Sequence, residues 1–138
     1  PPATSSTWSS RTEMTIREFE DEAAAALDAV PAHLRAYLDT VQIVTAPLPD
    51  AGQRRRMRLR HRHRASLYGL YEGWTVPQRL TGDQRGLAPS VITLFRLPLR
   101  RDFPDEAGLR REIRHTLWHE LAHHFGISDR QLREWGVY

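Results

Sequence analysis

Cysteine and lysine are both missing from the 138-residue chain. Without cysteine the protein can form neither disulfides nor thiolate metal sites, so any metal ion must be bound by histidine and carboxylate side chains. No apolar run approaches the ~20 residues that span a bilayer, and the first residues lack the basic and apolar regions of a secretory signal. These absences predict a soluble protein without membrane contact, and we expect it to be cytoplasmic.

Arginine supplies all of the positive side-chain charge, and it is unevenly spread. Residues 1–50 hold 3 arginines and 8 acids, whereas residues 51–90 hold 9 arginines and 2 acids. The centre of the basic region is "RRRMRLRHRHR", residues 54–64. Such a run attracts phosphate, acidic peptide or anionic lipid without requiring any particular fold. We expect it to form a solvated loop between two strands.

Helical patterns dominate the first part of the chain. Residues 1–12 are rich in proline, serine and threonine without periodicity, which predicts a flexible tail before a domain formed by residues 13–138. Apolar residues then recur at spacings of three and four, behind a capping-box pattern at Thr15 and Glu18. An amphipathic helix is therefore expected, and Pro31 should end it and begin a second, shorter helix.

Three later segments have the composition of strands: residues 41–46, 66–73 and 90–99. The last of them is the most continuously apolar, so it should be the central strand of the sheet. Glycines in the second indicate an edge strand. The segment between these two, residues 74–89, carries proline and glycine at close intervals and is expected to be a loop.

From Pro104 onward the apolar residues recur every four positions until Gly126, which predicts a long helix. A last short helix is expected from about Ser128 to the C-terminal end of the sequence. The fold class is therefore predicted to be α+β, with two N-terminal helices, a mixed sheet of about three strands, the long helix and a short C-terminal helix.

The long helix contains a pattern that suggests a metal site. His119 and His123 are one helical turn apart, so both imidazoles can reach the same ion. Glu120 is displaced round the helix, where its carboxylate can reach a water on the metal without binding the metal itself. This H-E-x-x-H arrangement is typical of two zinc ligands and a general base. Glu120 is the only formally charged residue between His115 and Gly126, which predicts a buried, functional carboxylate.

A third ligand is expected from the turn after the helix. Gly126 allows the chain to swing back, which would bring the Asp129 carboxylate beneath the two histidines. The alternative role of Asp129 is helix capping, because Ser128 and Gln131 form a capping-box pattern and an acid in the first turn of a helix is favourable. We favour the ligand role, since capping does not provide the third donor that zinc needs.

The extended pattern H-E-x-x-H-x-x-G-x-x-D resembles that of the zincin metallopeptidases, in particular the small bacterial minimal zincins. These are similar to metzincins but have aspartate as the third ligand. The segments "LDTVQIV", "LYGLYEG", "VITLFRLPL" and "HELAHHFGISD" follow the order of that family over roughly residues 14–138. The resemblance implies a zincin-like domain that binds Zn²⁺ through His119, His123 and Asp129, with Glu120 as the catalytic acid/base.

The resemblance also implies an enzyme that hydrolyses peptide or amide bonds, in which Glu120 activates a zinc-bound water for attack on the carbonyl. Zincins of this kind bind an extended peptide against an edge strand, which here implies contacts with the substrate at Gly69, Leu70 and Tyr71. The sequence departs from true metzincins in one respect. Its only methionines are Met14 and Met57, so we expect no methionine turn after the third ligand.

The remaining histidines and the basic run allow other interpretations. His115 is expected at the wall of the cleft or beside a ligand, and His124 as a hydrogen-bonded core residue. The alternative function is a nucleic-acid or acidic-partner binding module that uses residues 54–64, Arg54 to Arg64, together with a structural or vestigial zinc site. No recognised nucleic-acid module surrounds this run, so a peptide or protein substrate is the favoured partner.

Overall fold

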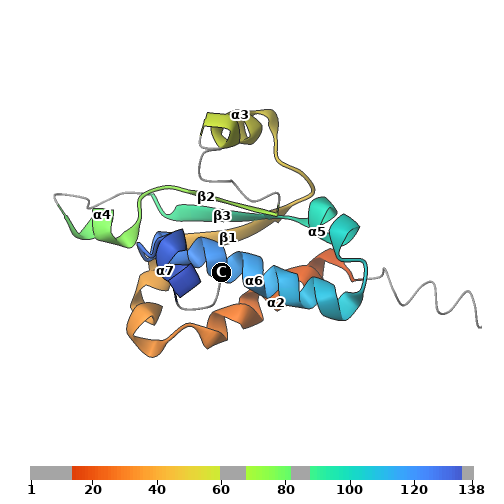
Figure 1. Ribbon diagram of the computed structural model, residues 1–138, viewed down its shortest axis with the longest axis horizontal. Coiled ribbons are helices and arrows are strands. Elements are labelled where there is room, and N and C mark those ends of the chain that lie inside the picture. Colours follow the sequence, from red (N-terminus) through yellow and green to blue (C-terminus); the bar gives the residue numbers. More distant parts are fainter. Residues whose placement is uncertain (1–13, 60–67, 82–87, 135–138) are drawn as a thin grey trace, which may run out of the picture.

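The computed structural model describes residues 14–59, 68–81 and 88–134 of the chain. Within these ranges a three-stranded sheet carries two long helices on one face (Figure 1). The strands are β1 (Val41–Ala46), β2 (Gly69–Glu72) and β3 (Ser90–Phe95). The predicted α+β class is therefore confirmed. The expected tail, residues 1–12, lies outside the described residues.

The strand order is β1-β3-β2, with β3 parallel to β1 and antiparallel to β2. Ile92 of β3 lies opposite Ile43 of β1 and opposite Tyr71 of β2, and it is fully buried. The most apolar strand is thus the central one, as its composition predicts. Among the described strands β2 pairs only with β3, so it forms one edge of the described sheet, and Gly69, Leu70 and Tyr71 in it are buried.

Two helices precede the sheet, as expected. Helix α2 (Ile16–Ala26) begins with the predicted capping box, in which Thr15 and Glu18 exchange side-chain to backbone hydrogen bonds. A short 3₁₀ turn, η1 (Leu27–Ala29), follows, and Pro31 is the N-cap of a second 3₁₀ helix, η2 (Ala32–Thr40).

The long helix α6 (Glu106–His124) packs on the same face of the sheet as α2 (Figure 1). Asp105 caps its first turn by accepting a hydrogen bond from the Gly108 backbone at 3.0 Å. Its apolar face buries Leu109, Ile113, Leu117 and Leu121 against α2 and the sheet. The short helix α7 (Asp129–Glu134) follows.

None of the helices in the three described ranges combines the length and the apolar composition needed to cross a lipid bilayer.

An ion-pair cluster joins α2 to α6. The Glu22 carboxylate, whose side chain is 11% exposed, accepts hydrogen bonds from Arg110 and Arg114, each at 2.7 Å. Burial raises the pKa of Glu22, but the two arginines outweigh this effect and hold the pKa below its ordinary value of 4.5. Because the folded-state pKa is depressed, the cluster stabilises the protein above about pH 4.5, and that contribution is lost as the pH falls through the folded-state pKa.

We therefore expect Glu22→Gln to lower the free energy of unfolding at pH 7 by about 1–3 kcal/mol, since it removes the buried charged acceptor that Arg110 and Arg114 share. The matched control is Glu106→Gln, because Glu106 pairs with Arg110 at 3.3 Å but is 49% exposed. It should cost less than ~0.5 kcal/mol. Urea unfolding at pH 7 and at pH 3.5 is the measurement, and the difference between Glu22→Gln and the parent should shrink at the lower pH. Equal losses for the two variants would contradict the expectation.

The structure corrects the sequence-based expectation for the basic run. Residues expected to be a solvated loop form helix α3 (Ala51–Leu59) instead, while residues 60–64 lie outside the described part. Asp50 and Gln53 cap its start reciprocally, with backbone to side-chain bonds of 2.7 and 3.0 Å. Arginine is a good helix former, so the run that follows supports the helix once the cap has started it.

Two other expectations differ from the structure. The segment predicted as loop between β2 and β3 contains helix α4 (Val76–Leu80), which Thr75 and Gln78 begin with a capping box. The third predicted strand ends at Phe95 and continues as helix α5 (Arg96–Asp102). Pro98 explains the change, because proline cannot donate to a sheet but is tolerated in the first turn of a helix.

Candidate metal centre

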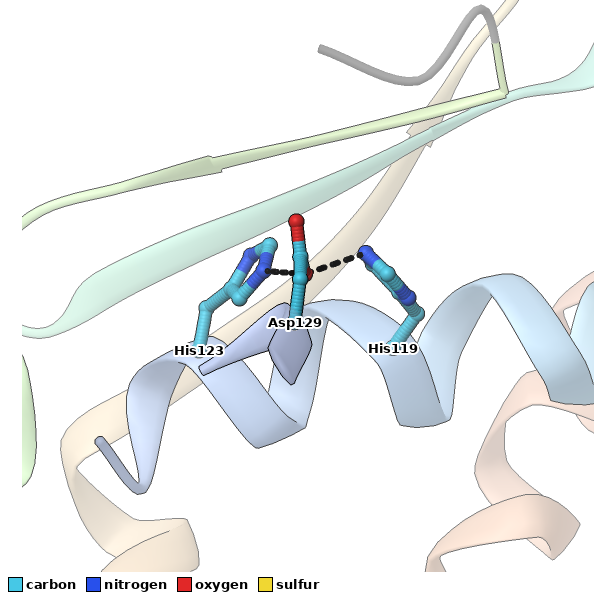
Figure 2. A group of neighbouring side chains, drawn as sticks. All are labelled: His119, His123 and Asp129. Carbon is cyan, nitrogen blue, oxygen red and sulfur yellow. Dashed lines mark hydrogen bonds and ion pairs between the residues drawn. The ribbon is translucent and has the colours of Figure 1, made fainter. Parts of the chain in front are cut away.

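His119 and His123 project from the same side of α6 toward the sheet (Figure 2). Their ring centroids are 4.8 Å apart, and the ring planes are inclined at 77°. Both side chains are partly buried. One helical turn therefore places two imidazoles side by side, as the spacing predicts.

The chain then turns back through a Schellman motif at the end of α6. Gly126 has a φ of 85°, and its backbone N–H donates to His123 at 3.0 Å. The N–H of Ile127 donates to Ala122 at 2.8 Å. A left-handed residue at this position reverses the chain direction, and glycine adopts it without strain. Asp129 is the third residue after Gly126, just beyond this turn.

The Asp129 carboxylate lies between the two histidines (Figure 2). Its Oδ1 is 2.9 Å from Nε2 of His123 and 3.4 Å from Nε2 of His119. The potential ligand atoms of the three residues all lie within 4.8 Å of one another. The predicted capping box of α7 is present too, but it is formed by Ser128 and Gln131, each accepting a backbone N–H of the other at 3.2 Å. Capping therefore does not occupy the Asp129 carboxylate.

The three side chains form an electrostatic environment that attracts positive charge. Hydrogen bonds from His123 to Glu120 and Asp129 raise the pKa of His123 to about 9. Burial lowers the pKa of His119. Burial would raise the pKa of Asp129, but its contacts with both histidines hold it below the ordinary value. A metal ion that binds here must therefore displace a proton from His123, because only the neutral imidazole binds metal.

The donor set fits a zinc ion. It offers two imidazole nitrogens and one carboxylate oxygen, and sulfur ligands are excluded by the sequence. Three protein ligands of this kind leave one position for water or substrate, which is the arrangement of catalytic rather than structural zinc sites. In the described part of the chain, His119, His123 and Asp129 form the group that could hold a metal.

Glu120 lies beside this group and is only 5% exposed. Its Oε1 is 3.3 Å from Nδ1 of His123. On the other side it faces β2, because a Cβ atom added to Gly69 would lie 3.5 Å from Cγ of Glu120 and only 2.8 Å from Cγ2 of Thr116. Glycine at position 69 therefore allows the edge strand to approach α6 closely at the level of Glu120.

His124 is a buried core residue, as expected, and not part of the metal group. The Thr40 hydroxyl donates to the Tyr37 carbonyl at 2.6 Å, so Nε2 of His124 must donate to Thr40, at 2.7 Å. Its Nδ1 is then the acceptor for the Tyr71 hydroxyl, at 2.6 Å. Burial and the nearby Arg79 lower the pKa of His124 to about 4, so it is neutral at pH 7. His115, by contrast, is exposed.

One supporting contact was not predicted from the sequence. Pro77 of α4 packs against the turn that carries Asp129, since a Cβ atom on Gly126 would lie 2.5 Å from Cγ of Pro77. Arg79 anchors the same helix by donating to the carbonyls of Trp74 at 3.1 Å and Ala88 at 2.9 Å. The capping-box pattern Thr75-x-x-Gln78 was the available signal for this helix.

The fold and the site together define a class of protein: a domain whose long helix carries H-E-x-x-H and a candidate metal centre beneath a mixed sheet. The model of the zincin-like metallopeptidase family matches residues 38–137, which is more than half of the sequence. The chain therefore belongs to the zincin-like metallopeptidase family. A search of the curated proteins gave no match. The matched region includes all three strands, α6 and the candidate metal centre.

Proposed function

We propose that the protein is a zinc-dependent peptidase in which His119, His123 and Asp129 bind Zn²⁺ and Glu120 is the catalytic acid/base. The observation that carries this proposal is the convergence of three ligand atoms within 4.8 Å beside a buried glutamate. Membership of the zincin-like metallopeptidase family supports both the metal and the reaction class. The reaction is hydrolysis of a peptide or amide bond.

Zinc supplies Lewis acidity at such a site, which favours ionisation of water and polarises a carbonyl group. The Glu120 carboxylate then receives the proton of the attacking water and passes it to the leaving amine. Its burial beneath β2 fits this role, since a carboxylate shielded from solvent keeps the proton within the site. His123 is held in place by Glu120 through Nδ1, which leaves Nε2 directed toward Asp129.

The substrate in this proposal is an extended peptide that contacts β2 at Gly69, Leu70 and Tyr71. Leu70 and Tyr71 are 4% and 5% exposed, so their side chains are largely enclosed within the protein. In this proposal the peptide is recognised mainly through backbone hydrogen bonds, as in other cases of strand addition. Gly69 brings the paired segment close to Glu120.

The proposal is tested by incubating zinc-loaded protein with a mixture of random peptides and detecting new termini by mass spectrometry. Cleavage should stop when a chelator is added and return when zinc is restored. Products that form equally in the presence of chelator would contradict a zinc-dependent reaction.

Asp129→Ala is expected to weaken zinc binding by at least ~100-fold, because loss of a ligand should cost no less than loss of a residue that merely supports one. The matched control is Ser128→Ala, which removes the cap of α7 but leaves the carboxylate in place. It should cost about 0.5–2 kcal/mol of stability and leave zinc affinity nearly unchanged. Zinc affinity is measured by competition with a chromogenic chelator. The reverse pattern, with only Ser128→Ala affecting zinc, would show that residues 128 and 129 act through capping.

A further inference from the structure

A buried hydrogen-bond network lies at the C-terminal end of α6, outside the group of candidate ligands. His124 of α6 is fully buried and accepts from the Tyr71 hydroxyl of β2 at 2.6 Å. The Ser90 hydroxyl of β3, also fully buried, lies 3.0 Å from that of Tyr71 and donates to the Trp74 carbonyl at 2.7 Å. The network therefore continues from the end of α6 through two strands to the segment that leads into α4.

Gly73 allows the chain to pass closely against β3 at this point. It has a φ of 126°, and a Cβ atom there would lie 2.5 Å from Oγ of Ser90. A side chain at this position would therefore both strain the backbone and collide with Ser90. The chain enters α4 shortly afterwards, at Val76, so the start of this helix is fixed close to the sheet.

Arg79 anchors α4 to the same network. Its guanidinium donates to the Trp74 carbonyl at 3.1 Å, to the Ala88 carbonyl at 2.9 Å and to the Ser90 hydroxyl at 3.0 Å. Helix α4 has only five residues, of which Val76 alone is buried. A helix this short is not stable by itself, and one buried apolar side chain adds little support. The position of α4 therefore depends largely on the hydrogen bonds of Arg79.

On its other side α4 contacts the turn that follows α6. Pro77 packs against Gly126, and α4 and α7 lie at the same end of the sheet (Figure 1). The contacts form a closed ring, which runs from α6 through Tyr71 and Ser90 to α4, and from Pro77 back to the turn. Asp129 lies just beyond this turn, so the ring encloses the backbone that carries its carboxylate.

We propose that Arg79 is a positioning residue that keeps the Asp129 carboxylate beside the two histidines. It acts through α4, whose Pro77 holds the turn at Gly126. Glycine is conformationally permissive, so this turn needs a contact from outside to stay in one conformation. Helix α7, with six residues, is too short to provide it. The inference rests on the proposed function, because it takes Asp129 as a ligand of the metal.

The test measures the zinc affinity of Arg79→Met by competition with a chromogenic chelator. Methionine keeps much of the apolar stem but removes every donor, so zinc affinity should fall about tenfold, as is typical when a residue that orients a ligand is lost. Arg79→Lys keeps the charge but lacks the planar fork, and it should recover part of the affinity. The visible spectrum of the Co²⁺-loaded protein reports ligand geometry, and in Arg79→Met it should shift toward that of Asp129→Ala.

The matched control is Arg35→Met in η2. Arg35 also holds backbone carbonyls, those of Val30 at 3.1 Å and Asp28 at 2.7 Å, but it lies outside the ring. Both variants should lower the temperature of thermal unfolding by a few degrees, since each loses hydrogen bonds to the backbone. Only Arg79→Met should weaken zinc binding, whereas Arg35→Met should change the affinity by less than ~2-fold.

A double-mutant cycle separates positioning of the carboxylate from a general loss of structure. If Arg79 acts through Asp129, its substitution should have no effect on a protein that lacks that carboxylate. In the Asp129→Ala background, Arg79→Met should therefore change the zinc affinity by less than ~2-fold. A tenfold loss that persists in this background would overturn the inference, as would equal effects of Arg79→Met and Arg35→Met on zinc binding.

Failure of the inference and failure of the proposed function give different results. A parent protein that binds no zinc would overturn both. Zinc binding that Arg79→Met leaves unchanged would overturn the inference alone. Zinc binding that depends on Arg79, in a protein that cleaves no peptide, would reject the peptidase but support the positioning role.

Discussion

Glu120→Gln should abolish peptide hydrolysis while leaving the metal centre and the fold intact. The substitution keeps the size of the side chain but removes the group that takes up and returns a proton, a contribution typically worth ~10²–10⁴ in rate. Because Glu120 is 5% exposed, the amide also stays within the enclosed space between α6 and β2. The measurements are the turnover rate on a cleaved peptide and the zinc content after dialysis.

The control for this experiment is Glu112→Gln, the same chemical change on the same helix and outside the metal group. It should retain the parent rate within ~2-fold, as expected for a substitution that touches neither the metal nor the reacting groups. A Glu120→Gln protein that turns over peptide at the parent rate with its zinc bound would show that another residue is the base. A protein that loses its zinc would show that Glu120 contributes to metal binding instead.

Gly126→Ala should both destabilise the fold and weaken the candidate metal centre. The residue has a φ of 85°, where an alanine costs about 1–2 kcal/mol. The added Cβ would also lie 2.5 Å from Cγ of Pro77, so α4 or the turn must move. We expect a loss of more than ~2 kcal/mol in unfolding free energy. Because the turn carries Asp129, zinc affinity should fall at least ~10-fold.

Gly108→Ala is the matched control, because this glycine lies in the first turn of α6 and the nearest atom to an added Cβ is 3.6 Å away. It should be neutral or stabilise the protein by up to ~1 kcal/mol, since alanine is the better helix former. In the double variant Gly126→Ala/Pro77→Ala, relief of the contact should restore part of the zinc affinity while the cost of the backbone conformation remains. If Gly126→Ala behaved like Gly108→Ala in both measurements, the turn would not position the Asp129 carboxylate.

The sequence predicts those features of the fold that depend on neighbours along the chain. The capping box at Thr15 and the periodicity of α6 are local patterns, so the helices are found where they were expected. His119 and His123 belong to one helix, which fixes their relative positions without tertiary information. Predicting that Asp129 lies beside the two histidines required one further local argument, the left-handed turn at Gly126.

The features that the sequence does not predict have two physical origins. Helices α3 and α4 are short and lack a clear apolar stripe, so their capping boxes are the main signal and periodicity says little. The contacts that support the centre are long-range: the Tyr71 hydroxyl reaches His124, and Pro77 reaches Gly126. Contacts of this kind depend on how strands and helices meet in space, and a single sequence contains no periodicity that encodes them.

The hydrogen bonds of His124 have a consequence for the order of events during folding. Its two ring nitrogens join three segments that are distant along the chain, through Thr40, Tyr71 and α6 itself. The candidate metal ligands, in contrast, come from a single stretch of eleven residues, 119–129. Contacts between distant residues form late, because closing a long loop costs entropy before it yields any contact. On the proposed function, a newly made chain therefore gathers its zinc ligands before β2 lies beside them, so metal binding precedes peptidase activity.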